Sequence, residues 1–409
     1  MVTDVVVIGA GAAGLLAAAV AAERGRKTVL LEKNAKTGVK ILASGGTRCN
    51  VTNTASAREL VEIFGPGAGG RFLRAAFQAF DSEAVVRLLA EEGVETKVED
   101  HGRVFPVSDR ATDVALALER RARARGAEIR LASPSAEVGR LAAGGFAVKT
   151  PQGEIRARSV VVATGGVSYP RTGTTGDGYA IARAIGHAIV EPKPALVPFR
   201  ASEPWIAALR GVAAEDPVLS LVARDDVVYR ERRAVLFTHF GLSGPGILNA
   251  SRFAVRARGQ IRVDLDLLPD CSEDELERVI REAAARSGSR SLRNSALVPL
   301  PERLFAAVLA ERARVDPSRK LAGLTREERR RVASALKRLS IPIDGTLGFE
   351  KAEVTAGGVS VDEVKQSTME SRLVPGLFFV GEVLDVEGPM GGYNFQAAFS
   401  TGFLGGMSA

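Results

Sequence analysis

Three glycines near the beginning of the chain have the spacing of a phosphate-binding turn. Gly9, Gly11 and Gly14 form a GxGxxG pattern in "GAGAAG", which follows the apolar stretch "DVVVIG" and precedes an Ala/Leu-rich stretch. In such a pattern the first glycine permits a tight turn, the second lets the backbone approach a pyrophosphate, and the third lets helix and strand pack closely. The stretch "KTVLLE" then predicts a second strand ending in Glu32, whose carboxylate suits an adenosine ribose. We therefore expect a nucleotide site that includes Gly9, Gly11, Ala12, Ala13, Gly14, Glu32 and Lys33.

Two distant segments favour FAD over NAD as the nucleotide. The stretch "ARSVVVATGG" ends in Thr164, Gly165 and Gly166, and "GLFFVGEVLD" contains Gly381 and Glu382. In two-part FAD sites a strand ending in ATG returns the chain to the nucleotide domain, and an acid after a C-terminal strand lies near the flavin ribitol. A simple NAD dehydrogenase needs neither segment. The prediction is non-covalently bound FAD. Because no second fingerprint follows a strand, NADH or NADPH is a candidate electron donor that diffuses freely.

The stretch "SGGTRCNVTN" is interpreted as a loop that grips the cofactor and not as a thiol site. Its first three residues can bend the backbone closely around a ligand, and its arginine can pair with a phosphate. Cys49 has no resolving cysteine nearby and no motif-linked histidine base, so we expect a small packed residue. The predicted cofactor contacts in and near this loop are Lys40, Ser44, Gly45, Gly46, Arg48, Cys49 and Asn50.

The stretch "GGYNFQAAF" follows Glu382 and predicts a helix that begins with glycines. A helix N-terminus there would stabilise negative charge on the flavin ring. Tyr393 is a catalytic candidate on this helix, and His239 in "FTHFGLSGP" is the best histidine candidate for proton transfer. A lone histidine beside phenylalanines is more often a core or hinge residue. The expected cofactor contacts in this segment are Gly391, Gly392, Tyr393 and Asn394.

These motifs occur in an order that resembles one known family. The sequence is similar to the aminoacetone-oxidase-like and bile-acid-reductase-like family of FAD-binding, NAD(P)/FAD-dependent oxidoreductases. The resemblance covers nearly the whole chain and also includes "GRVFPVSDRATDV", "VVATGGVSYPRTGTTGDGY", "LFTHFGLSGPGIL" and "TMESRLVPGLFFVGEVLD". Thr47 stands where the family usually has a glycine, and Val39 stands where a basic residue is common. The resemblance implies an α/β fold in which a Rossmann-like FAD-binding domain, with a two-part FAD site, carries an inserted β-rich substrate domain and a helical subdomain.

The sequence supports this division by itself. The three prolines of "EPKPALVPF" indicate a boundary near Lys193, and short alternating runs typical of strands follow. Capping boxes at Ser272–Glu275 and Thr325–Glu328, and an apolar face at 304–309, then predict helices. A second glycine-rich stretch at residues 65–70 lacks a preceding strand and is expected to be a loop. The expected domains are an FAD domain at 1–192 and 346–409, a β-rich domain at 193–268 with part of 337–350, and a helical insert at 269–336.

Composition restricts the class of protein. The 409 residues carry a net charge of +7, but acidic and basic residues are interleaved, which favours solvated helix faces over a nucleic-acid surface. Two distant cysteines and three scattered histidines predict neither a disulfide framework nor a metal site, as expected in a reducing cytoplasm. The uncharged segment 5–22 is rich in Gly and Ala and follows Asp4, so we expect neither a signal peptide nor a membrane helix.

The preferred function is that of an FAD-dependent oxidoreductase. It would transfer a hydride between bound FAD and a small organic substrate, NAD(P)H or both, without a nucleic-acid or membrane partner. A flavin-dependent RNA-modifying enzyme, which the basic charge would suit, and a non-catalytic protein stabilised by FAD are the alternatives. The sequence indicates no oligomeric state and no particular substrate.

Overall fold

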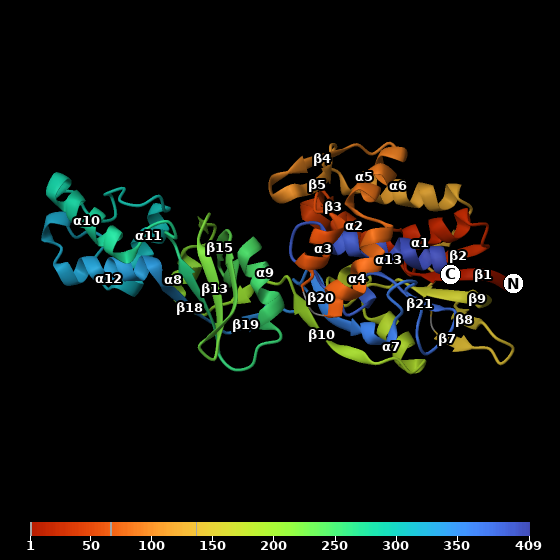
Figure 1. Ribbon diagram of the computed structural model, residues 1–409. Coiled ribbons are helices and arrows are strands. Elements are labelled where there is room, and N and C mark those ends of the chain that lie inside the picture. The colour runs from red at the N-terminus through yellow and green to blue at the C-terminus, as the bar shows by residue number, and fades with distance from the viewer. Residues whose placement is uncertain (1, 66–67, 136) are drawn as a thin grey trace. The chain divides into compact units, whose positions relative to one another are not determined.

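The computed structural model describes residues 2–65, 68–135 and 137–409. The chain divides into two compact units (Figure 1). Unit 1 consists of Met1–Pro194 and Ala352–Ala409, and unit 2 consists of Ala195–Lys351. Both chain ends therefore belong to unit 1. The finer division into three domains that the sequence suggests stays a prediction.

The main sheet of unit 1 has the strand order β6–β2–β1–β9–β8–β7, and β21 pairs with the last part of β9. Strands β6, β2, β1, β9 and β21 run parallel, whereas β7 and β8 form antiparallel pairs beside β9. Buried strands such as β1 are apolar because both faces of a parallel sheet are covered. The strands are β1 (Val2–Ile8), β2 (Thr28–Leu31), β6 (Glu128–Arg130), β7 (Glu137–Arg140), β8 (Phe146–Thr150), β9 (Gly153–Val162) and β21 (Leu377–Phe379).

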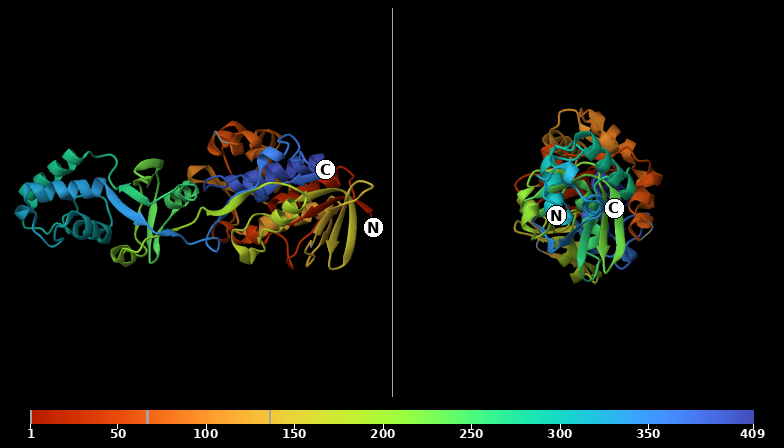
Figure 2. Two further views of the ribbon diagram at one scale, coloured as in Figure 1. Left: turned by 90° about the horizontal axis from the view of Figure 1, so that it is seen from below. Right: turned by 90° about the vertical axis from the view of Figure 1, so that its left-hand side faces the viewer.

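Helices α1 (Ala12–Glu23) and α13 (Tyr393–Ser408) pack closely against each other (Figure 2). Glycines of α13 allow this approach, since a Cβ atom added at Gly402 would lie 2.4 Å from the carbonyl oxygen of Ala13. The uncharged segment 5–22 is thus a buried strand and a buried helix. Within the described ranges, no helix has both the length and the apolar character needed to cross a bilayer.

Further elements surround this sheet. They include the sheets β3–β5–β4 and β10–β20. The sequence predicts a loop at residues 65–70, of which residues 66 and 67 lie outside the described residues. Gly69 and Gly70 belong to helix α4, so the prediction of a loop is wrong for these two residues. The other elements of unit 1 are α2 (Val39–Ala43), β3 (Thr52–Asn53), α3 (Ala57–Ile63), α4 (Ala68–Ala79), α5 (Ser82–Glu91), β4 (Thr96–Glu99), β5 (Arg103–Pro106), α6 (Ala111–Ala124), α7 (Asp177–Ala184), β10 (Ile189–Ala195) and β20 (Val354–Val359).

Unit 2 contains two antiparallel sheets, β12–β15–β16–β11–β19 and β14–β13–β17–β18, and a group of helices. The capping boxes predicted at the starts of α10 and α12 are confirmed, and the apolar face at 304–309 is buried at α11 and in the turn after it. The elements are β11 (Phe199–Arg200), α8 (Pro204–Ala208), β12 (Ala213–Ala214), β13 (Val218–Ala223), β14 (Asp226–Arg232), β15 (Val235–Thr238), β16 (Gly241–Ser243), α9 (Pro245–Ala254), β17 (Ile261–Asp266), α10 (Glu273–Ser287), α11 (Glu302–Val308), α12 (Arg326–Lys337), β18 (Leu339–Ile343) and β19 (Gly345–Thr346).

Candidate functional site

The carboxyl ends of β1, β9 and β21 bring three glycine-containing turns to one edge of the sheet. The turn after β1 holds Gly9, the turn after β9 holds Gly165, and the turn after β21 holds Gly381. Ligands of open α/β sheets bind outside the carboxyl ends of the strands. The fold therefore gathers segments that are up to about 370 residues apart in the sequence, as the FAD interpretation requires.

The three glycines of the first turn have different environments. Gly9 has φ +102°, and a Cβ atom added there would lie 2.5 Å from the carbonyl oxygen of Ala163. A Cβ atom at Gly14 would lie 1.8 Å from the carbonyl oxygen of Gly9. Packing alone thus requires two of the glycines. A Cβ atom at Gly11 meets no atom within 4 Å, so this glycine leaves open space at the N-terminus of α1, where backbone N–H groups favour an anion.

Glu32 follows β2 and is held in one orientation. It is 7% exposed. Its Oε2 atom accepts a hydrogen bond from the backbone N–H of Ala10 at 2.7 Å, and its Oε1 atom accepts from the backbone and side-chain nitrogens of Asn34 at 2.9 and 2.8 Å. Each carboxylate oxygen can accept more than one hydrogen bond, so the geometry still suits a ribose hydroxyl. Lys33 is instead paired with Asp177 at 2.7 Å, so its predicted cofactor contact has no support from this arrangement.

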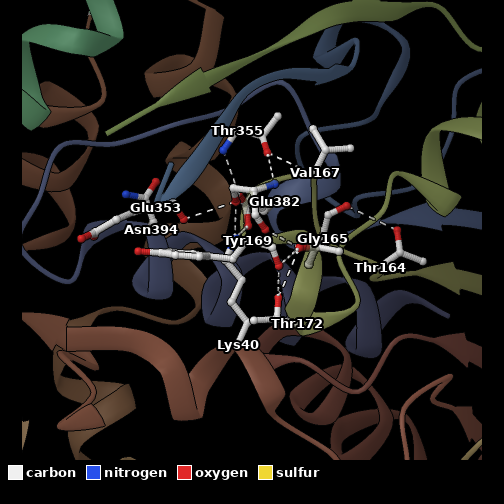
Figure 3. Close-up of polar contacts among 12 residues, drawn as sticks. Lys40, Thr164, Gly165, Val167, Tyr169, Thr172, Glu353, Thr355, Glu382 and Asn394 are labelled. Carbon is white, nitrogen blue, oxygen red and sulfur yellow. Dashed lines mark hydrogen bonds and ion pairs between the residues drawn. The ribbon is translucent and has the colours of Figure 1, made fainter. Parts of the chain in front are cut away.

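A polar cluster joins α2, the turn after β9, the start of β20 and the turn after β21 (Figure 3). Lys40 forms an ion pair with Glu382 and donates to the Oγ atom of Ser168 at 2.6 Å. The Oε1 atom of Glu382 accepts from Ser168 Oγ at 2.9 Å and from the backbone N–H of Thr355 at 2.8 Å. The predicted residues Lys40 and Glu382 thus belong to one network, and Lys40 neutralises a half-buried carboxylate there.

The loop that follows α2 has an unusual backbone. Gly45 and Gly46 have positive φ values of +54° and +66°, and Thr47 and Cys49 have values of +72° and +63°. Left-handed backbone costs an L-residue roughly 1–2 kcal/mol, and a β-branched residue in this region is an outlier. The glycine usual at position 47 in the resembling family would relieve this strain. The loop is therefore held in a conformation that its sequence only partly favours.

Cys49 is fully buried, and burial raises the pKa of its thiol to about 12. A thiol in this state is a poor nucleophile, because the thiolate is the reactive form. The next residue, Asn50, has a buried Oδ1 atom that lacks a hydrogen-bond partner within the described part of the chain. A buried acceptor of this kind is suited to a ligand donor or an ordered water.

Arg48 does not offer a free charge to a phosphate. Its guanidinium forms ion pairs with Glu99 and Asp109 and lies over the ring of Phe105, 4.3 Å from the centroid. These two carboxylates raise the pKa of Arg48, and in return Arg48 keeps the pKa of Glu99 below its usual value. This pairing speaks against the phosphate contact predicted for Arg48, because its charge is already neutralised by residues of the β4–β5 region.

The N-terminus of α13 packs against the segment after Cys49. Gly392 has φ +91°, and a Cβ atom added there would lie 2.2 Å from the carbonyl oxygen of Thr52 and 2.9 Å from Asn50 Oδ1. Asn394 closes its own loop, since its Oδ1 atom accepts from the N–H of Gly388 at 2.8 Å. Tyr393 is half-buried at the first position of the helix. No acidic residue occupies the first turn of this helix, so its positive end is available to an anion.

His239 belongs to unit 2, in the exposed turn between β15 and β16. Its ring packs edge-on against Phe240, with 5.0 Å between the centroids. Its proposed part in proton transfer stays a prediction. Across the described ranges, no three His, Cys, Asp or Glu side chains are grouped so that they could hold a metal ion.

Sequence reasoning missed Ser168 and Glu353. Ser168 and Thr355 are fully buried and hydrogen-bonded within the polar cluster, and Glu353 and Tyr169 lie beside it. One signal was available in the sequence. Glu353 is a carboxylate immediately before the apolar stretch "VTAGGV", a position where an acid has no ordinary role in packing.

Comparisons with known proteins identify the family of this chain. Residues 3–408 match a family described as "HI0933-like protein Rossmann domain". The chain is 34% identical over 402 residues to the ribosomal RNA dihydrouridine synthase of Escherichia coli K12, covering 97% of this chain and 96% of that protein. It is 30% identical over 408 residues to the 3-dehydro-bile acid delta(4,6)-reductase of Clostridium scindens, covering 98% of each.

Solved structures show the same fold. A 3-ketosteroid-Δ4-(5α)-dehydrogenase from Rhodococcus jostii superimposes with a TM-score of 0.54 at 17% identity, over 100% of this chain and 96% of that chain. A 3-ketosteroid Δ1-dehydrogenase from Sterolibacterium denitrificans gives a TM-score of 0.52 at 14% identity, over 99% and 98%. The predicted α/β fold with a Rossmann-type sheet is confirmed.

Proposed function

We propose, because this chain belongs to the HI0933-like family of FAD-dependent oxidoreductases, that it reduces a carbon–carbon double bond conjugated to a carbonyl group. FAD, when bound, supplies the hydride chemistry of the flavin ring. The residues described above fit this cofactor, since the open space at Gly11 and the immobilised Glu32 are suited to a pyrophosphate and a ribose. NADH or NADPH is proposed as the donor that reduces the bound FAD.

One observation carries the choice of reaction. Two relatives with nearly full coverage have different substrates by name, a uridine of ribosomal RNA and a bile acid. Dihydrouridine is uridine in which the double bond beside the C4 carbonyl has been reduced, and a 3-dehydro-delta(4,6) bile acid carries double bonds conjugated to a ketone. Both names therefore describe the addition of hydrogen across an enone-like double bond. We infer that the same half-reaction is the function shared with this chain.

The chain's own residues have defined tasks in this reaction. The N-terminus of α1 binds the pyrophosphate, and Glu32 orients the adenosine ribose. The ion pair with Lys40 orients Glu382 as an acceptor for hydroxyl groups of the ribitol. The N-terminus of α13 stabilises negative charge on the flavin ring through the helix dipole.

Anaerobic half-reactions test this proposal. The purified holoprotein is first reduced with NADH, with NADPH or by light, and is then mixed with a 3-oxo-Δ4 steroid, with uridine or with ribosomal RNA. We expect the oxidised flavin spectrum to return with at least one of these acceptors and not with its saturated counterpart. If none of these acceptors reoxidises the flavin and an amine substrate bleaches the oxidised flavin instead, the proposal is contradicted.

The distribution of charge favours RNA as a second candidate substrate. Unit 2, residues 195–351, contains 27 Lys and Arg against 21 Asp and Glu, whereas the rest of the chain has 28 against 27. Nearly all of the net charge of +7 thus belongs to unit 2, and residues 286–338 alone have 14 basic against 5 acidic residues. The expectation that nucleic acid is not a partner therefore has no support.

Some of these basic groups are free to meet phosphates. Arg290, Arg314, Lys320 and Arg330 are exposed, and none of them forms an ion pair within the described part of the chain. Replacing the four by glutamate should weaken binding to ribosomal RNA and reduce its salt dependence, because each phosphate contact contributes to the salt slope. Replacing Arg140 and Arg183, which are exposed in unit 1, by glutamate provides a control for charge reversal elsewhere on the protein. An equal loss of RNA affinity in both variants would exclude these four residues as specific contacts of the RNA.

A further inference from the structure

Glu353 occupies a fixed position beside the polar cluster. It directly precedes β20, all of whose residues are buried. Its backbone oxygen accepts a hydrogen bond from Ser168 Oγ at 3.3 Å. Two residues later, Thr355 Oγ1 accepts from the backbone N–H of Val167 at 2.9 Å, and the N–H of Thr355 donates to Glu382. The start of β20 is therefore bound to the turn after β9, at the edge of the sheet where the cofactor is expected.

The carboxyl group of Glu353 differs from that of Glu382. Glu382 is satisfied by Lys40, Ser168 and Thr355. Glu353 is half-buried, and within the described residues its carboxyl group makes no hydrogen bond. Burial raises the pKa of Glu353, and the charge of Lys40 only partly opposes this. The group therefore keeps its proton to a higher pH than an ordinary glutamate does, while its oxygens remain available to a ligand.

Tyr169 lies next to Glu353, on the same side of the cluster (Figure 3). Its backbone has φ +49°, which is strained for a residue with a side chain. Two hydrogen bonds maintain this conformation, because the backbone N–H and the Oγ1 hydroxyl of Thr172 each donate to the carbonyl oxygen of Tyr169 at 2.8 Å. Burial, followed by the negative charge of Glu353, raises the pKa of the Tyr169 hydroxyl. Strained residues that are over-determined by their surroundings are frequent in active sites.

We propose that Glu353 is the catalytic acid that delivers the proton in the reduction. This inference rests on the proposed function. When hydride has joined the carbon β to the carbonyl, the electron pair of the double bond forms a new C–H bond at the α carbon. The proton for that bond comes from Glu353, whose O–H bond breaks and leaves a carboxylate. Water then returns the proton, and the two electrons come from the reduced FAD.

A Glu353→Gln variant tests this inference, because glutamine keeps the shape of the side chain but has no acidic proton. We expect unchanged FAD content and an unchanged rate of flavin reduction. Reoxidation by the enone acceptor should fall by about 100-fold or more, the usual contribution of a general acid. Reoxidation by ferricyanide, which needs no proton at carbon, should stay at the wild-type rate. Glu353→Asp should recover part of the lost rate. Glu95→Gln serves as the control, because Glu95 is exposed and forms no ion pair with the described residues.

Two readouts separate a catalytic from a structural role. The wild-type reoxidation rate should fall as the pH rises through the pKa of Glu353, and this limb should be absent in Glu353→Gln. In an infrared pH titration, a protonated-carboxyl band should persist to higher pH than that of an ordinary glutamate, and the same variant should lack this band. If the enone reoxidises the wild-type protein and the Glu353→Gln variant at the same rate, the role of Glu353 is wrong but the proposed function stands. Failure of every conjugated acceptor with wild-type protein would overturn the proposed function, and this inference with it.

Discussion

Replacing Gly11 should remove FAD from the protein without unfolding it, whereas replacing Gly14 should destabilise the fold itself. Gly11 is the N-cap of α1 with φ −81°, a value that any residue adopts, and an added Cβ atom meets nothing within 4 Å. Alanine at an N-cap costs roughly 1 kcal/mol or less relative to glycine. The unfolding free energy of the Gly11→Ala apoprotein should therefore remain within about 1 kcal/mol of the wild-type value.

The effect on FAD should be much larger. A side chain at position 11 would occupy the open space at the N-terminus of α1 where we propose that the pyrophosphate binds. Hydrogen bonds to a charged group contribute about 1.5–3 kcal/mol each. Losing two of them weakens binding by about 3–6 kcal/mol, or roughly 10²–10⁴-fold in Kd. The larger side chain of Gly11→Val should have at least this effect.

Gly14→Ala has the opposite signature. Its Cβ atom would lie 1.8 Å from the carbonyl oxygen of Gly9 and 3.1 Å from the Cβ atom of Ala163, so α1 would have to move away from the sheet. Overpacking of this kind costs about 1–3 kcal/mol or more. Urea unfolding of the apoproteins and fluorescence titration with FAD measure the two effects separately. Tight FAD binding by Gly11→Val, or wild-type stability of Gly14→Ala, would refute this reasoning.

Three further predictions concern individual side chains. In the folded protein, burial raises the pKa of the Cys49 thiol to about 12, whereas its pKa in the unfolded chain is about 8.5. Between these two pH values only the unfolded chain loses the proton, so the free energy of unfolding should fall by up to about 1.4 kcal/mol per pH unit. Cys49→Ser should abolish this slope while retaining FAD, and an unchanged slope would contradict the assignment. Lys40→Met should leave Glu382 without its counter-charge and increase FAD loss during dialysis, and Lys40→Arg should lose less FAD than Lys40→Met. Equal FAD retention in the wild type and both variants would argue against a role for this ion pair. Arg48→Ala should lower the melting temperature more at low salt than at 1 M salt and leave FAD affinity nearly unchanged, whereas a large loss of affinity would restore the phosphate contact.

Local sequence patterns predicted the elements that carry the proposed cofactor site. Glycine spacing, a buried strand and a following helix are short-range features, and the structure places Gly9, Gly14 and Glu32 as such a unit requires. Helix starts at Ser272 and Thr325 were also predictable, because a capping box is complete within four residues. The burial of Cys49 followed from the absence of any chemical partner near it in the sequence.

Tertiary structure decided which charges meet. The partners of Arg48 lie 51 and 61 residues away, on and after the β4–β5 hairpin, so no local pattern could show that its charge is already paired. Tyr169 and Glu353 are 184 positions apart in the sequence, and they become neighbours only because β20 is bound to the turn after β9. The sequence determined which segments could form strands, helices and a phosphate-binding turn, because those depend on near neighbours. The protonation state of a carboxyl group depends on burial and on charges a few ångströms away, and these are set only when distant segments pack together.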